Sequence, residues 1–262
     1  MSTVLQLLGY ELRNVFRNRW LIVYTLLFLV LTDALFRFGG SGSRVILSLT
    51  NVVLALIPLV SIVFGTMYLY HAREFIELML AQPVGRRSLF AGLYGGLAVP
   101  LALSFLLGVG LPFAWHGGIA GNATGFAILM GAGVLLTLVF TALAFVVALR
   151  FQDRAMGLGA AILVWLMAAV LYDGLLLLAI TWFRDYPVEK PILVATLLNP
   201  VDLGRVLLLL QFDLSALMGY TGAVFERFFG SRTGTLVSLA ALLAWTAVPL
   251  AGGMRRFMRK DW

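Results

Sequence analysis

The sequence predicts an all-α membrane protein with six transmembrane helices, and two observations carry this prediction. Of the 262 residues, 61% are hydrophobic and 12% are charged, whereas about 25% charged residues are usual in soluble domains. So little polar surface cannot cover a globule of this size, and lipid must solvate much of the chain. The apolar residues also gather in six runs, each long enough at about 1.5 Å per residue to cross a hydrocarbon core of about 30 Å. The runs cover residues 20–36, 45–70, 89–114, 126–149, 158–182 and 234–254.

The stretch before the first run, residues 1–19, predicts an amphipathic elbow helix that lies in the plane of the membrane surface. Polar residues recur three or four positions apart from Gln6 to Arg17, and apolar residues fill another face of 4–18. Asn18-Arg19-Trp20 then supplies the basic and aromatic residues typical of a membrane interface.

Proline and glycine inside the runs give two local predictions. Pro58 and Pro100 lie in the middle of their runs and predict kinks, because proline removes a helical hydrogen bond. The pairs Gly95-Gly96 and Gly131 with Gly133 predict close contacts between helices, since glycine lets backbones approach.

Lysine and arginine are distributed unequally between the two predicted sides of the membrane. With the N-terminus inside, 12 of the 19 basic residues fall in inner segments and 7 in outer segments, five of these in one long outer segment that counts weakly. Both termini are therefore predicted to be cytoplasmic. The basic residues form no single patch with interleaved aromatics, so the sequence favours anionic membrane lipid over nucleic acid as the partner for the net charge of +7.

Residues 71–88 form a short charged segment between the second and third runs, and they predict a small amphipathic helix. Its charged side consists of Arg73, Glu74 and Glu77, three or four residues apart. Its apolar side consists of Phe75, Leu78 and Met79. Pro83 ends the helix, and Arg86 and Arg87 mark a cytoplasmic edge. Two interpretations stay open: an ordinary cytoplasmic loop, or a transverse helix on which a cytoplasmic partner pushes.

The last outer segment, residues 183–233, predicts two short helices that dip into or lie on the outer membrane face. The sequence Leu198-Asn199-Pro200-Val201-Asp202 predicts a turn whose final aspartate caps the first helix, over 203–212. Asp213 is expected to cap the second helix, over 214–228.

Two aspartates, Asp33 and Asp173, lie within or near the ends of apolar runs, where a charge costs at least a few kcal/mol. Both are therefore candidates for a transport pathway. For Asp33 the alternative is an ion pair with Arg37, four residues on, near the outer end of its span. For Asp173 a water-facing position near a dimer cavity and a buried structural role both stay open.

No catalytic or metal site is predicted. The chain has no cysteine, and its two histidines, His71 and His116, lie on opposite predicted sides of the membrane. No Ser, His and Asp converge in the pattern, and the sequence lacks the phosphate-binding loop G-x-x-x-x-G-K-[ST].

The order of these parts resembles the permease subunit of ABC-2 type transporters, which have the type V exporter fold. The segment from Glu77 to Arg87 is similar to that family's acidic, leucine-rich, Pro-x-x-Arg coupling segment, although this chain has Arg73-Glu74-Phe75-Ile76 where the family often has Glu-x-Gly-Thr. Three further motifs resemble the NosY-type membrane subunit of the nitrous oxide reductase maturation ABC transporter. They are Asn18-Arg19-Trp20, Leu198-Asn199-Pro200-Val201-Asp202 and the basic, aromatic end from Arg255 to Trp262.

The resemblance implies one transmembrane domain over 1–262 in the bacterial inner membrane. It implies a separate ATPase subunit that holds the ATP and Mg, a second copy of the chain and a periplasmic partner protein. It assigns ATPase coupling to Arg73, Glu74, Phe75, Glu77, Leu78, Pro83 and Arg86. It assigns the extracytoplasmic turn to Asn199, Pro200, Asp202 and Arg205. The alternatives are a membrane assembly factor or intramembrane enzyme without an ATPase, and a secondary transporter, whose usual internal repeats the sequence lacks.

Overall fold

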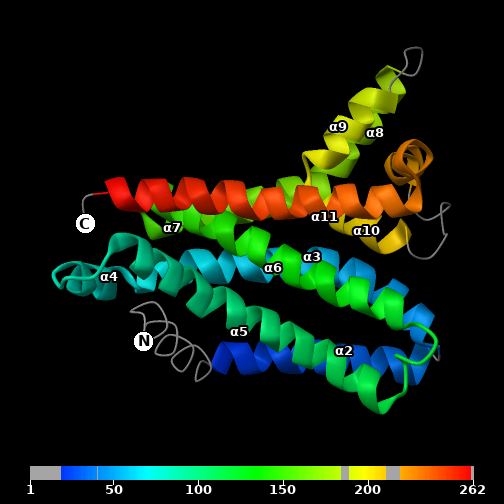
Figure 1. Ribbon diagram of the computed structural model, residues 1–262, viewed down its shortest axis with the longest axis horizontal. Helices are drawn as coiled ribbons and strands as arrows, with labels where there is room; N and C mark the ends of the chain where they lie inside the picture. Colours follow the sequence, from blue (N-terminus) through cyan, green and yellow to red (C-terminus); the bar gives the residue numbers. More distant parts are fainter. Residues whose placement is uncertain (1–18, 40, 184–188, 211–218, 261–262) are drawn as a thin grey trace.

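The computed structural model describes residues 19–39, 41–183, 189–210 and 219–260, and these ranges contain helices and no strand (Figure 1). Six helical segments are long and apolar enough to cross a membrane, which confirms the predicted fold class. They are α2 (Arg19–Gly39), α3 (Gly42–His71), α5 (Arg86–Trp115), α6 (Ala123–Arg150), the bent segment Arg154–Trp182 and the Thr233–Arg259 part of α11 (Gly219–Arg259). The expected surface helix over 4–18 and the expected cap Asp213 lie outside the described residues.

The loops between spans gather at two opposite ends of the bundle. At one end Gly42 lies so near the α5–α6 loop that an added Cβ would be 2.7 Å from the Gly118 carbonyl oxygen. At the other end the Tyr70 hydroxyl donates to the Phe151 carbonyl at 2.9 Å. The short helix α4 (Arg73–Leu80) and the end of α11 also lie there (Figure 1). We call the first the hairpin end, because the helical hairpin of residues 189–209 packs near it against Leu47 of α3. We call the second the α4 end.

The core is built around α3, α5 and α6, the most buried spans. Aromatic rings pack edge to face between helices, with Phe28 of α2 against Phe105 of α5 at 5.4 Å and Phe36 against Phe113 at 4.8 Å between ring centroids. Such pairs add stability beyond the area they bury. Both α3 and α5 continue as helices through Pro58 and Pro100.

The fifth span differs from the others because it is broken and almost unburied. It consists of α7 (Arg154–Leu166), the π-helical turn η1 (Met167–Leu171) and α8 (Tyr172–Trp182). In η1 the backbone N–H of Tyr172 donates to the carbonyl of Met167, five residues back, and so the helix is locally widened. Figure 1 shows α8 leaving the bundle at this point together with α9 (Glu189–Leu197).

Gly133 is one of the predicted contact glycines, and its substitution tests the core. An added Cβ would collide with the Phe105 ring, whereas a Cβ on Gly131, two residues away on the same helix, would meet nothing within 4 Å. We expect Gly133→Val to lower the free energy of unfolding by about 1–3 kcal/mol through overpacking. Denaturant unfolding in detergent measures it, with Gly131→Val as the matched control. Equal losses in the two variants would contradict this packing.

Candidate coupling helix and re-entrant hairpin

The helix α4 presents one face to the bundle and the other to solvent. Ile76 is fully buried, and Phe75 and Met79 are half-buried against the main core. Leu78 is 67% exposed and shares the outer face with the exposed Glu74 and Glu77. The expectation that Leu78 lies on the side of Phe75 and Met79 is wrong, because the buried face is centred on Ile76 and helical spacing turns residue 78 away from it.

Two arginines of the 71–88 segment bind other parts of the permease. Arg73 Nη2 donates to the Phe151 carbonyl at 3.4 Å, and its guanidinium lies 4.7 Å from the centre of the Tyr70 ring. Arg86 Nη1 donates to the Met258 carbonyl at 2.8 Å and lies 3.3 Å from the Lys260 carbonyl, so it caps the end of α11. These contacts join the α4 region to the α6–α7 loop and to the last span. Sequence spacing gave no signal for them.

Around this segment, two turns are set by local sequence. Pro83 is exposed in the turn that follows Leu80, the last residue of α4, as the sequence predicts. Asp153 caps α7, since its Oδ1 accepts from the backbone N–H groups of Ala155 at 2.6 Å and Met156 at 3.0 Å. The span that carries η1 therefore begins at a fixed point beside Phe151.

At the opposite end, α9 and α10 (Pro200–Leu209) form a helical hairpin with a bend of 101°. A Cβ added to Gly204 of α10 would lie 3.0 Å from Leu54 and 3.2 Å from Leu136. Leu54 and Leu136 lie near the middle of α3 and α6. The α10 half of the hairpin therefore packs against α3 and α6 at about half the depth of the bundle. Whether the segment dips into or lies on the outer membrane face stays a prediction.

Two expectations about this region are wrong. The helix starts at Pro200 and not at 203, because Asn199 is its cap and Pro200 occupies the first helical position, where a missing N–H costs nothing. Asp202 is therefore not a cap. The expected second helix over 214–228 is not a separate element where it is described, because α11 is helical without a break from Gly219.

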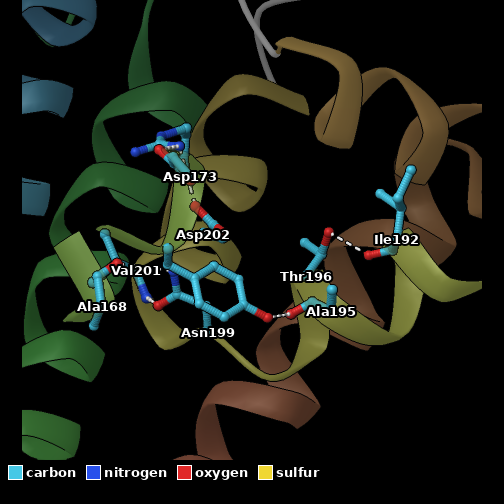
Figure 2. A network of polar contacts seen from close by, with 10 residues as sticks. Ala168, Asp173, Ile192, Ala195, Thr196, Asn199, Val201 and Asp202 are labelled. Atoms are coloured by element: carbon cyan, nitrogen blue, oxygen red, sulfur yellow. Dashed lines mark hydrogen bonds and ion pairs between the residues drawn. The ribbon is translucent and has the colours of Figure 1, made fainter. Parts of the chain in front are cut away.

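The turn of the hairpin is fastened to spans five and six by hydrogen bonds to backbone carbonyls, and Figure 2 shows those to Ala168 and Ala195. Asn199 Oδ1 accepts from the N–H of Val201 at 3.1 Å, and its Nδ2 donates to the carbonyl of Ala168 in η1 at 2.9 Å. The Tyr172 hydroxyl donates to the Ala195 carbonyl at 2.6 Å, and Trp245 Nε1 donates to the Leu197 carbonyl at 3.0 Å. At this depth no bulk water is available to satisfy the carbonyls, so these donors hold the turn in place.

A cluster of three charges links the hairpin to α8. Arg205 Nη1 lies 2.5 Å from Asp173 Oδ2 and 3.1 Å from Asp202 Oδ1. The Asp202 side chain is 3% exposed, and its Oδ2 has no hydrogen-bond partner among the described residues. The cluster thus places two carboxyl groups around one guanidinium in a poorly solvated place. The sequence leaves a water-facing role and a buried structural role open for Asp173. In the structure Asp173 forms an ion pair with Arg205 of the hairpin, which sequence spacing does not predict.

Asp33 lies apart from this cluster, at the hairpin end of α2. Its Oδ2 is 2.7 Å from Arg37 Nε, which confirms the alternative of an ion pair. Its Oδ1 is 2.8 Å from His116 Nε2 and accepts from Trp115 Nε1 at 3.3 Å. The aspartate therefore joins the ends of the first and third spans.

An apolar cavity of about 450 Å³ lies beside the hairpin turn, between α6, the fifth span and α11. Asn199 and Tyr172 are among its lining residues, with Phe140, Met167 and Trp245. The cavity therefore leaves unfilled space between the hairpin turn and η1. Over the described ranges, no group of three or more His, Cys, Asp or Glu side chains is placed to hold a metal ion.

Six apolar spans, an amphipathic helix at one end and a bent helical hairpin define a multi-pass membrane protein. The model of the ABC-2 family transporter proteins matches residues 5–262, and the chain belongs to this family. It is 28% identical over 273 residues to a probable ABC transporter permease protein NosY of Pseudomonas aeruginosa, covering 98% of both chains. It is also 28% identical over 281 residues to the protein of the same name from Stutzerimonas stutzeri, covering 99% of both.

As a member of this family, the chain is the permease subunit of an ABC transporter. ABC-2 permeases work with a separate ATPase subunit and commonly form dimers. The six spans and these relatives fit a multi-pass protein of the inner membrane. The expected family and the expected similarity to NosY-type permeases are both confirmed.

Proposed function

We propose that α4 is the coupling helix through which a separate ABC ATPase drives this permease. The observation that carries the proposal is the two-sided burial of α4. Ile76 fixes it to the permease, while Leu78 and two carboxylates form a free outer face. Arg73 and Arg86 connect the same segment to the fifth and sixth spans through Phe151 and Met258. A push on the outer face would therefore move several spans together.

We further propose that the hairpin receives this motion on the periplasmic side. The fifth span connects the two sites: it begins beside Phe151 at the α4 end, and it binds the hairpin through Ala168, Tyr172 and Asp173. Its π-helical turn is a place where a helix can bend with little loss of hydrogen bonding. The output is either export of a substrate or a conformational signal to a periplasmic partner protein.

One labelling experiment tests both the orientation and the coupling role. With both termini cytoplasmic, we expect a single cysteine at the exposed Gln82 to react with an impermeant reagent from the cytoplasmic side only. Binding of an ABC ATPase encoded beside the chain should then protect it. A cysteine at the exposed Ala120 is the control and should react only from outside, with or without the ATPase.

Protection at neither position would favour an assembly factor or intramembrane enzyme that works without an ATPase. Reaction of Ala120 from the cytoplasm would contradict the orientation.

We also propose that the complex serves the maturation of nitrous oxide reductase. The resemblance of three short motifs to NosY-type subunits supports this, as does the similarity to two curated permeases of that name. In a host that makes this reductase, loss of the chain should leave the reductase polypeptide present but poor in its metal. The metal content of the purified reductase measures this, and a normal content would direct the search to another substrate or partner.

A further inference from the structure

A cationic cavity of about 500 Å³ opens at the α4 end, between the end of α6 and the end of α11. Its cationic lining residues are Arg150, Arg255, Arg256, Arg259 and Lys260. Leu149, 8% exposed, supplies an apolar wall, and none of the described lining residues carries a carboxylate. The cavity lies apart from the outer face of α4 and from the hairpin, and neither proposed role uses it.

The arginines are held on this side of α11 by a buried anchor. Phe257 is fully buried and its ring lies 5.4 Å from that of Phe90, which fixes the rotation of the last turn. Arg255 and Arg259, four residues apart, then share one side of the helix, with Arg256 next to them. In the described part of the chain, no ion pair joins Arg150, Arg255, Arg256 or Arg259 to an acidic side chain.

The electrostatic surroundings of the cavity favour an anion. Five cationic side chains line it, and burial and the nearby charge of Arg73 lower the pKa of Lys260. Arginine binds phosphate oxygens in bidentate geometry, and several guanidinium groups around one cavity suit a phosphate better than a single carboxylate.

The depth of the cavity matches the layer of lipid headgroups. The spanning part of α11, Thr233–Arg259, has 27 residues. At about 1.5 Å per residue it exceeds a hydrocarbon core of about 30 Å, so its last turns extend into the headgroup layer. Arg150 ends α6 at the same level, beside Leu149. The charged rim thus lies at the level expected for lipid phosphates, with the apolar wall beside it.

We propose that this cavity binds the headgroup of an anionic phospholipid, with the lipid phosphate on the arginines and the glycerol end over Leu149. A lipid is favoured over an acidic protein surface because the wall is apolar and the arginines lie where the spans leave the membrane. Basic pockets between transmembrane helices on the cytoplasmic side are recurrent sites of anionic lipids.

Native mass spectrometry of the full-length, delipidated permease in detergent tests the proposal, with phosphatidylglycerol and phosphatidylcholine as probes. The test variant is Arg255→Gln, Arg256→Gln, Arg259→Gln. The control removes the same charge from three exposed arginines outside the cavity, Arg19→Gln, Arg44→Gln, Arg87→Gln. We expect phosphatidylglycerol to bind the unaltered chain more tightly than phosphatidylcholine. Its affinity should fall about tenfold or more in the test variant, and little in the control.

Four outcomes would overturn the proposal. Equal losses in both triple variants would mean diffuse attraction and no site. Equal affinity for the two lipids would mean that the headgroup charge is not recognised. Displacement of phosphatidylglycerol by millimolar inorganic phosphate would identify a soluble anion as the ligand. Unchanged lipid binding, with loss of ATPase capture in the test variant alone, would identify the cavity as an ATPase contact.

Discussion

Arg205→Gln is expected to lower the free energy of unfolding by about 3 kcal/mol or more, the largest stability effect of any single substitution considered for this chain. The variant removes the cation that lies 2.5 Å from Asp173 and 3.1 Å from Asp202. The two carboxylates would then face each other without a cation at a place where Asp202 is almost fully buried. Thermal or denaturant unfolding of the purified permease in detergent measures the loss.

Two further variants separate the ionic contact from general damage. The triple variant Asp173→Asn, Arg205→Gln, Asp202→Asn should recover most of the stability, because removing every charge of a buried cluster removes the penalty for an unpaired one. Arg37→Gln is the matched control, since Arg37 pairs with Asp33 but its side chain is 70% exposed. It should cost far less than Arg205→Gln. If the two single variants were equally stable, Arg205 would not be a link between α8 and the hairpin.

The features that the sequence predicted well are those that lipid and local chemistry impose. A span needs a long apolar run whatever it packs against, so all six were found from hydropathy and length. The end of α4 follows from Pro83, which cannot continue a helix. The ion pair of Asp33 with Arg37 needs only the spacing of four residues on one helix.

The features that were missed depend on contacts between distant segments. Asp173 and Arg205 are 32 residues apart, and only the bent helical hairpin brings them together. In the π-helical turn, the carbonyl of Ala168 accepts a hydrogen bond from the Asn199 side chain. No local sequence pattern predicts this partner. The start of α10 is different, because Asn followed by Pro is a recognisable cap and first helical position. Asp202 also has the side chain of a helix cap, but in the structure it pairs with Arg205.

The outer face of α4 shows how burial changes a functional expectation. Spacing groups Phe75 with Leu78 on one side of the helix, and the family resemblance assigns both to ATPase coupling. In the structure Phe75 packs against the core of the permease itself. Phe75→Ala is therefore expected to destabilise the permease and to disturb the ATPase only indirectly. Leu78, 67% exposed on a helix whose other face is buried, is therefore the apolar anchor that we propose for the ATPase.

Leu78→Ala should weaken binding of the ATPase about 30-fold, which corresponds to about 2 kcal/mol for truncating an apolar anchor in a partner's cleft. Glu77→Gln should weaken it only about fivefold or less, since exposed ion pairs contribute little. The measurement is the concentration of ATPase that half-saturates the immobilised, full-length permease, with thermal unfolding of each variant as the check that it is folded. Leu78→Ala should keep the stability of the unaltered chain, because its side chain contributes little to the permease core. Binding of Leu78→Ala as tight as that of the unaltered chain would leave residues 71–88 as an ordinary cytoplasmic loop.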